Sequence, residues 1–253
     1  MVLENQLIND KWENVLPGLP DECCELVLAD PPYNISNENK IFRDYRSGKN
    51  GDISMDFGSW DFSFNPAPFL EQAKRILKPE GSILVFTSRQ LAPVYEQWFQ
   101  QNMIVKNFIT LTSTNPLPQF RLTNYRSATQ HIYWASKQPI KRSNPNFNFL
   151  EQEEMTNSWY APICGGHERV GHPCQKPLAI CQKLIKIHCR PGGLVVDPFS
   201  GVGSIPLAAY SLGRKYIGIE MDKKWHEVAQ QRIKDYQIKV EQETDKFEQV
   251  KMF

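Results

Sequence analysis

Short apolar runs alternate with amphipathic segments along most of this chain. Runs rich in branched and aromatic residues predict β-strands over residues 25–29, 82–87, 105–112, 130–135, 193–197 and 215–220. Apolar residues at helical spacing predict helices over 68–77, 91–101, 177–188, 204–212 and 223–236. Strands that alternate with helices are typical of a mainly parallel sheet with helices on both faces. We therefore predict one Rossmann-like α/β domain that spans residues 1–253.

Two long stretches interrupt this alternation. Residues 34–65 and 139–172 are polar, rich in Gly, Asn, Ser or Pro, and show no clean period. Loops of this length inside a compact domain usually serve a function. The final stretch, "KVEQETDKFEQVKMF", is highly charged and predicts a frayed helix or a tail.

The composition is that of an ordinary globular protein. The 253 residues carry a formal net charge of +1 and are 41% hydrophobic, so the chain can bury a full core and has no uniformly basic coat. No apolar run approaches the ~20 residues of a membrane span, and the N-terminus is acidic where a signal peptide would be basic. Six cysteines are too few for a disulfide framework in a chain of this size. We predict a soluble, cytoplasmic protein with no membrane contact.

The stretch "LVLADPPYNIS" runs an apolar strand into an acid, two prolines and a tyrosine. Pro31 and Pro32 stop the strand, because neither has an N–H and both have a fixed φ. Asp30 is therefore left at the carboxyl end of the strand, with Tyr33 just beyond it in a stiff loop. Ligands bind at this edge of an open α/β sheet. The simpler interpretation is an ordinary proline-ended connection, so the rest of the chain has to decide.

A second motif, "DPFSGVGS", joins a buried strand that ends at Asp197 to a following helix. Gly201 and Gly203 permit a close approach to the backbone, and a helix N-terminus favours anions. Glu220 ends the next strand, at about the 20-residue offset where an acid meets the ribose hydroxyls of a nucleotide. Pro206 stands where a dinucleotide fingerprint has its third glycine. The pattern indicates an adenosine-bearing cofactor that lacks a pyrophosphate.

Together these motifs resemble those of the DNA amino-methyltransferases that use S-adenosylmethionine. "DPPY" is similar to their catalytic motif, "DPFSGVGS" to their cofactor motif, and "HPCQKP" to the segment that precedes it. The catalytic motif comes first, which is the circularly permuted order of the beta group, and "STNPLPQFRLTNYRSATQHIYWASK" resembles that group's middle segment. "MDFGSWD" resembles a subset that methylates adenine N6. The resemblance implies a class I methyltransferase fold.

The resemblance assigns catalysis to Asp30, Pro31, Pro32 and Tyr33. The target base must leave the duplex before its amine can reach a methyl donor. Tyr33 is then expected to stack on the base through its ring, and not to act through its hydroxyl. Asp30 and the Pro31 carbonyl are expected to accept the two amine hydrogens, which favours the pyramidal nitrogen that attacks the methyl group.

The resemblance also implies a binding site for S-adenosylmethionine. Glu220 is expected to bind the ribose hydroxyls, Asp10 to accept from the adenine amine, and Lys176 to pair with the methionine carboxylate. Asp10 could equally be a helix N-cap before Lys11, and Lys176 could equally be a solvated surface residue. The turn is expected to supply the remaining contacts, which come from Asp197, Phe199, Ser200, Gly201, Gly203 and Ser204.

A basic and aromatic stretch over residues 121–142 suits a phosphate backbone and unstacked bases. The residues expected to bind DNA are Arg121, Arg126, Lys141 and Arg142. A solvated face beside a strand is the alternative. Double-stranded DNA is the expected partner, with 34–65 as a mobile DNA-contacting loop and 139–172 as a short target-recognition region.

The implied activity is methylation of adenine N6 in restriction-modification, with a cognate restriction endonuclease as a second partner. Asp30 favours N6 over cytosine N4, for which the family more often carries Ser there, and a cytosine-N4 methyltransferase stays an alternative. A non-catalytic DNA-binding protein would leave "DPPY" unexplained. No metal is expected, although "CGGHERVGHPC" holds zinc-capable side chains. The chain is expected to be a monomer or a homodimer.

Overall fold

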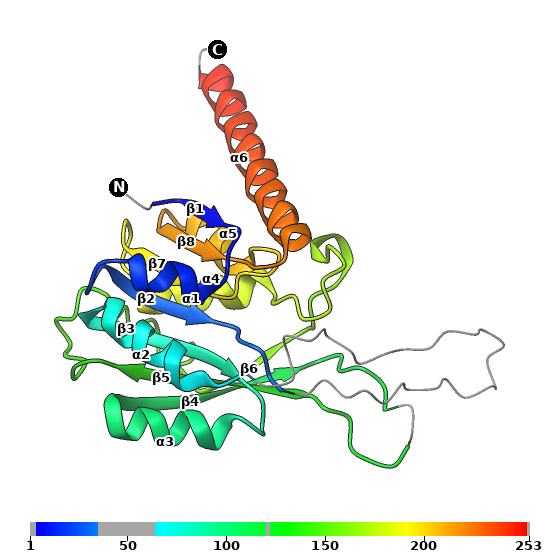
Figure 1. Ribbon diagram of the computed structural model, residues 1–253. Coiled ribbons are helices and arrows are strands. Elements are labelled where there is room, and N and C mark those ends of the chain that lie inside the picture. The colour runs from blue at the N-terminus through cyan, green and yellow to red at the C-terminus, as the bar shows by residue number, and fades with distance from the viewer. Residues whose placement is uncertain (1–3, 35–63, 120–121, 252–253) are drawn as a thin grey trace.

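The computed structural model describes residues 4–34, 64–119 and 122–251 (Figure 1). Within them, eight strands form one sheet in the order β1-β8-β7-β2-β3-β5-β4-β6. The strands are β1 (Gln6–Ile8), β2 (Cys24–Ala29), β3 (Leu77–Thr87), β4 (Ile104–Ser113), β5 (Thr129–Ser136), β6 (Ser158–Ala161), β7 (Leu194–Asp197) and β8 (Lys215–Ile219). The helices are α1 (Trp12–Val15), α2 (Pro66–Ile76), α3 (Ala92–Asn102), α4 (Leu178–His188), α5 (Ser204–Ser211) and α6 (Lys223–Lys251), with 3₁₀ turns η1 (Leu16–Gly18) and η4 (Gly166–Glu168).

The predicted mainly parallel sheet is confirmed. Neighbouring strands from β1 to β3 in the sheet order pair in parallel, β5 runs antiparallel between β3 and β4, and β6 pairs in parallel with β4. Every predicted strand and helix is present with shifted ends. The largest shifts are in β3, which begins at Leu77, and in α6, which continues to Lys251 through the charged stretch.

Three short elements escaped prediction. β1, α1 and β6 are three or four residues long, which is too short to show either a strand or a helix period. β1 pairs with β8, where Gln6 lies opposite Ile217. β6 pairs with β4 and buries Trp159. Segments of this length depend on the neighbours that they pair with.

The core lies on both faces of the sheet. All six residues of β2 are buried. Leu26 and Leu28 pack into one cluster with residues of α4 and α5, whereas Val27 and Ala29 pack into the other with residues of α2 and α3. A central strand that is buried on both faces explains why its sequence is an apolar run instead of an alternation.

The longest helix, α6, projects beyond the sheet (Figure 1) and is rich in charged residues. Across the described residues, no helix combines the length and the apolar character that a membrane crossing needs. All six cysteines lie in the described part of the chain and are free thiols.

Glu25 is a buried carboxylate that links three strands. Its side chain is 2% exposed, and Oε1 accepts hydrogen bonds from Lys78 Nζ (2.7 Å) and Arg190 Nη2 (3.1 Å). Oε2 accepts from the backbone N–H of Leu194 at 2.7 Å, the first residue of β7. Burial raises the pKa of Glu25, but the bonds from Lys78 and Leu194 outweigh it and hold the pKa below its ordinary value.

Replacing Glu25 with Ala should lower the free energy of unfolding by about 2 kcal/mol, because Lys78 and the Leu194 N–H lose their acceptor. Glu80→Ala, at an exposed acid of β3, is the matched control and should change it by less than about 0.5 kcal/mol. Urea denaturation measures both variants. Equal losses would contradict a linking role for Glu25.

Candidate active site

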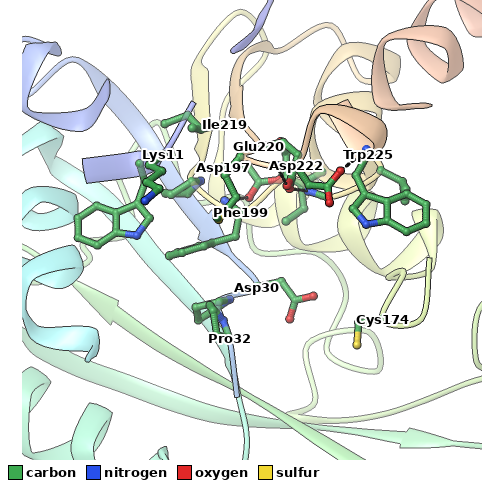
Figure 2. Close-up of a pocket in the computed structure, with 18 of the residues that line it drawn as sticks. Lys11, Asp30, Pro32, Cys174, Asp197, Phe199, Ile219, Glu220, Asp222 and Trp225 are labelled. Carbon is green, nitrogen blue, oxygen red and sulfur yellow. Dashed lines mark hydrogen bonds between the residues drawn. The ribbon is translucent and has the colours of Figure 1, made fainter. Parts of the chain in front are cut away.

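Three acids lie together at one edge of the sheet. Asp30 follows β2, Asp197 ends β7 and Glu220 follows β8. These strands are parallel neighbours, so their carboxyl ends meet. The three side chains line one cavity of about 900 Å³ (Figure 2). The structure therefore brings the "DPPY" motif and the glycine-bearing turn to a single site.

The carboxylate of Asp30 is bound from two sides. Oδ1 accepts from the Tyr33 hydroxyl at 2.5 Å, and Oδ2 accepts from the ammonium of Lys176. The Lys176 side chain is 5% exposed, so the alternative of a solvated surface lysine is wrong. Its ammonium also lies 5.3 Å from the ring centre of Tyr33 and 5.0 Å from that of Phe86. The buried ammonium of Lys176 and the carboxylate of Asp30 thus form an ion pair.

The sequence analysis expected Tyr33 to act through its ring and not through its hydroxyl, but in the structure this hydroxyl donates to Asp30. Burial, and then the nearby charge of Asp30, raise the pKa of Tyr33 well above its ordinary value. The phenol therefore stays neutral and donates to Asp30. Pro31 is buried, and both prolines line the cavity between Asp30 and Tyr33.

The turn between β7 and α5 depends on two glycines. Gly201 (φ +50°) and Gly203 (φ +75°) adopt the left-handed region that disfavours other residues. A Cβ on Gly203 would also lie 2.8 Å from the Cβ of Ala229 in α6. Ser200 N–H donates to Ile219 O at 2.9 Å, which fastens the turn to the end of β8. Close packing and backbone conformation both require Gly203.

Glu220 joins the end of β8 to this turn. Oε2 accepts from the backbone N–H of Gly201 and Oε1 from that of Asp222, each at 2.7 Å. Burial raises the pKa of Glu220 above its ordinary value, and these backbone bonds oppose that effect. The carboxylate is oriented before any ligand binds.

Asp197 and Ser200 leave buried polar atoms at the cavity. Asp197 Oδ1 accepts from the Phe199 N–H at 3.1 Å. Among the described residues, Asp197 Oδ2 and Ser200 Oγ are buried without a hydrogen-bond partner. Buried polar atoms are nearly always paired, so such atoms at a cavity favour polar groups of a ligand. Burial raises the pKa of Asp197 well above its ordinary value.

One end of the cavity is aromatic. The ring of Phe199 packs against Trp12, Phe64 and Phe69, with ring centres 6.4, 5.5 and 5.2 Å away. Of these four, Trp12, Phe64 and Phe199 line the cavity, as does Trp225. Figure 2 shows Trp225 apart from Phe199. The sequence analysis missed Trp12, Phe64 and Trp225. Trp12 lies two positions after Asp10, but no local pattern marks Phe64 or Trp225.

Asp10 lies at the rim of this cavity. Its Oδ1 accepts from the side-chain amide of Asn14 and from the Lys11 N–H, each at 2.7 Å. The hydrogen bond from Asn14, followed by that from Lys11, lowers the pKa of Asp10. The N-cap residue of α1 is Lys11, so the N-cap interpretation of Asp10 is wrong.

The predicted DNA-binding residues do not gather at one place. Arg121 lies outside the described residues. Arg126 is exposed in the β4–β5 connection, at the cavity edge of the sheet, and donates to the carbonyls of Pro116 and Leu117. Its role in DNA binding stays a prediction.

Lys141 and Arg142 are exposed, but they lie on the side of the sheet opposite the cavity, near the start of β3. The chain around them follows β5, and Asn144 Nδ2 donates to Glu80 O near the start of β3. The cavity lies at the other end of β3, beyond Thr87. These two basic residues therefore lie away from Asp30, because β5 runs antiparallel and carries the chain away from the cavity. Their role in DNA binding stays a prediction.

The segment 139–172 also has one part away from the cavity and one part that leads to it. Its first part packs against the far end of α4, where Asn148 N–H donates to Ile187 O at 2.8 Å. Its second part contains β6 and leads to His172 at the cavity. Of 34–65, the structure describes residues 34, 64 and 65.

The cysteines and histidines of "CGGHERVGHPC" do not form a cluster. Within the described residues, no group of three or more His, Cys, Asp or Glu side chains is placed to hold a metal ion. His172 and Cys174 line the cavity, where His172 packs edge-on against Trp225 with ring centres 4.8 Å apart.

The mixed sheet with helices on both faces and a cavity at its carboxyl edge is the class I methyltransferase fold. A complex of M1.HpyAVI with SAM superposes with a TM-score of 0.67 at 24% identity, covering 90% of this chain and 98% of that one. The PvuII DNA methyltransferase, described as cytosine-N4-specific, superposes with a TM-score of 0.67 at 18% identity over 88% of this chain and 84% of that one.

Sequence comparison identifies the family. Residues 24–231 match the DNA methylase family of N6 and N4 methyltransferases. The type II methyltransferase M.HinfI of Haemophilus influenzae is 35% identical, covering 93% of this chain and 71% of that protein. The type II methyltransferase M2.MboI of Moraxella bovis is 30% identical, covering 84% of this chain and 81% of that protein. The chain belongs to the DNA methylase family.

Asp197→Asn should stabilise the ligand-free protein increasingly as the pH rises. Because burial raises the pKa of Asp197 above 3.8, the folded chain keeps a proton that the unfolded chain loses above about pH 4. Wild-type stability from this group therefore falls with rising pH, whereas Asn has no proton to lose and can still accept from the Phe199 N–H. Thermal denaturation at a series of pH values should show a gain in melting temperature that grows as the pH rises above about 4. A gain that is independent of pH would contradict the assignment.

Proposed function

We propose that this DNA methyltransferase transfers a methyl group from S-adenosylmethionine to the N6 amine of an adenine that is turned out of double-stranded DNA. The observation that carries the proposal is the place of Asp30. Its carboxylate is held by Tyr33 and Lys176 and opens on the same cavity as Glu220 and the glycine-bearing turn. The carboxylate that would accept from the amine of the target base and the site that would bind the cofactor therefore lie in one cavity.

The polar and aromatic groups that line the cavity fit S-adenosylmethionine. Asp197 Oδ2 and Ser200 Oγ, which are buried without a partner among the described residues, suit polar groups of the amino-acid part. Glu220 suits the ribose hydroxyls, because a carboxylate that accepts two backbone N–H groups has lone pairs left for two more donors. Phe199 offers an apolar wall for the adenine, and Asp10 at the rim suits its amine. When bound, the cofactor supplies an electrophilic methyl group on a sulfonium.

Lys176 can serve both reactants. An ammonium has three N–H donors, so it can bind the methionine carboxylate while it still donates to Asp30. The same contact orients the Asp30 carboxylate, and the Tyr33 hydroxyl fixes its other oxygen. Two fixed donors leave the carboxylate little freedom to turn away from a base.

The chemistry requires such an acceptor. An exocyclic base amine is a poor nucleophile, because its lone pair is delocalised into the ring. Asp30 accepts one amine hydrogen and the Pro31 carbonyl the other, which favours a pyramidal nitrogen with its lone pair directed at the methyl group. After transfer the nitrogen releases one proton, for which Asp30 is the acceptor. Tyr33 contributes its ring as a stacking surface and its hydroxyl as a brace for Asp30.

The choice of adenine rests on Asp30 and on the resemblance of "MDFGSWD" to a subset that methylates adenine N6. The cytosine-N4-specific PvuII enzyme has the same fold, so the fold does not separate the two bases. Cytosine-N4 enzymes more often carry Ser at the position of Asp30. The relatives M.HinfI and M2.MboI are both named type II methyltransferases. By analogy, we place this chain in a restriction-modification pair with an endonuclease that acts on the same site.

Methyl transfer from tritiated S-adenosylmethionine to DNA, followed by nucleoside analysis, tests the proposal. We expect label in N6-methyladenine. Label in N4-methylcytosine would overturn the choice of base, and DNA without label would overturn the activity.

Asp30→Ala in the same assay should lower methyl transfer by about 10²- to 10⁴-fold, since it removes the acceptor. Calorimetry should still detect cofactor binding. Asp30→Asn keeps the shape, and we expect it to melt closer to wild type while it is nearly as inactive. Substantial turnover by a folded Asp30→Ala variant would refute the catalytic assignment.

Tyr33→Phe should lower methyl transfer by roughly tenfold, because Asp30 Oδ1 loses its hydrogen bond. Tyr33→Ala should lose a further factor of about 5 to 150 through lost stacking on the base. Single-turnover rates at saturating cofactor and DNA distinguish the two effects. A Phe variant that matches wild type would show that the ring acts alone, and a Phe variant as poor as Ala would exclude stacking.

A further inference from the structure

The side chain of Asn34 clamps the backbone of a residue thirty positions away. Its Nδ2 donates to the carbonyl of Phe64 at 3.0 Å, and its Oδ1 accepts from the N–H of Phe64 at 2.8 Å. Both functions of the amide are thereby used on both polar backbone groups of one residue. Such a two-point contact fixes the orientation of Phe64 as well as its distance.

The backbone of Asn34 suits this task. Its φ of +53° lies in the left-handed region, which Asn tolerates better than most residues other than Gly. The left-handed turn comes directly after Tyr33. A residue with a larger or branched side chain would be strained here and would also lose the two hydrogen bonds. Conformation and hydrogen bonding therefore both favour Asn at this position.

One side of the clamp rests on the cofactor end of the cavity. The Phe64 ring lines the cavity and packs edge-on against Phe199, with ring centres 5.5 Å apart. Phe199 belongs to the glycine-bearing turn, where its N–H is bound by Asp197. Asn34 itself does not line the cavity. Any effect of Asn34 on a bound cofactor must therefore pass through Phe64 or another neighbour.

On its other side, Asn34 adjoins Tyr33, the last residue of the "DPPY" motif. Asn34 follows Tyr33, whose carbonyl accepts from Ser88 Oγ at 3.0 Å, and Ser88 Oγ accepts in turn from the Leu91 N–H at 3.3 Å. The peptide between Tyr33 and Asn34 is thus held between the end of β3 and Phe64. Movement of Phe64 would strain the position of Tyr33, and hence of the hydroxyl bound to Asp30.

We propose that Asn34 is a positioning residue that holds Phe64 against the cofactor end of the cavity and thereby couples cofactor binding to the placement of Tyr33. This inference rests on the proposed function, since it assigns the cavity to the cofactor. It predicts that a residue outside the cavity controls cofactor affinity and the rate of methyl transfer together.

Asn34→Gly is the principal test, because Gly keeps the left-handed backbone and removes both hydrogen bonds. Cofactor binding by calorimetry should weaken by about tenfold, the effect of one to two lost hydrogen bonds. The rate of methyl transfer at saturating cofactor should also fall severalfold, because Tyr33 is less well placed. Asn34→Asp keeps the acceptor for the Phe64 N–H and loses the donor, so its affinity should lie between those of Gly and wild type.

A double-mutant cycle with Phe64→Ala distinguishes coupling from a general loss of stability. If Asn34 acts through the Phe64 ring, the double variant should bind cofactor within about twofold of Phe64→Ala alone. Independent effects would multiply, and would overturn the inference. Wild-type affinity in Asn34→Gly, or an unchanged rate at saturating cofactor, would overturn it as well. A wild-type protein that binds no cofactor would instead refute the proposed function, so the two failures are distinguishable.

Discussion

The parallel pairing of β2, β7 and β8 is the constraint on which the rest of the site depends. Parallel neighbours end on the same side of the sheet, so an acid at or just after the end of each strand is brought to one cavity, although the motifs are far apart in the sequence. Glu25 reinforces this pairing at the other end of β2, where it binds the first N–H of β7 and the ammonium of Lys78 in β3. Both ends of the central strand are thus held by carboxylates, one structural and one at the site.

The site is built from groups that are costly to bury alone. Lys176 is 5% exposed and needs the Asp30 carboxylate as much as Asp30 needs an orienting donor. Asp197 and Ser200 each have a buried oxygen without a hydrogen-bond partner in the described part of the chain. Such atoms lower the stability of the ligand-free protein, and a bound ligand would offset this loss by pairing with them. Stability and ligand affinity therefore oppose one another at this cavity, as they do at many functional sites.

Much of the fold was predictable because its elements carry their own signals. The fully buried β2 and the amphipathic α2 and α4 are recognisable from local pattern, and each was predicted close to its observed ends. β1 and β6 were not, because strands of three and four residues form only where β8 and β4 offer an edge. The early start of β3 likewise comes from pairing of Leu77 with Cys24, which no local pattern shows.

The sequence by itself determined that Asp30, Asp197 and Glu220 lie at strand ends. Pro31 and Pro198 stop two of these strands by local backbone chemistry, and the apolar run of the third ends at Ile219, directly before Glu220. Only the tertiary structure decided which groups meet there. Lys176 reaches Asp30 across 146 positions, and Phe64 reaches Asn34 across thirty. The antiparallel β5 carries residues 139–148 to the far edge, away from the cavity. Such contacts depend on strand order and direction, which arise from the packing of the whole sheet and leave no mark in any short stretch of residues.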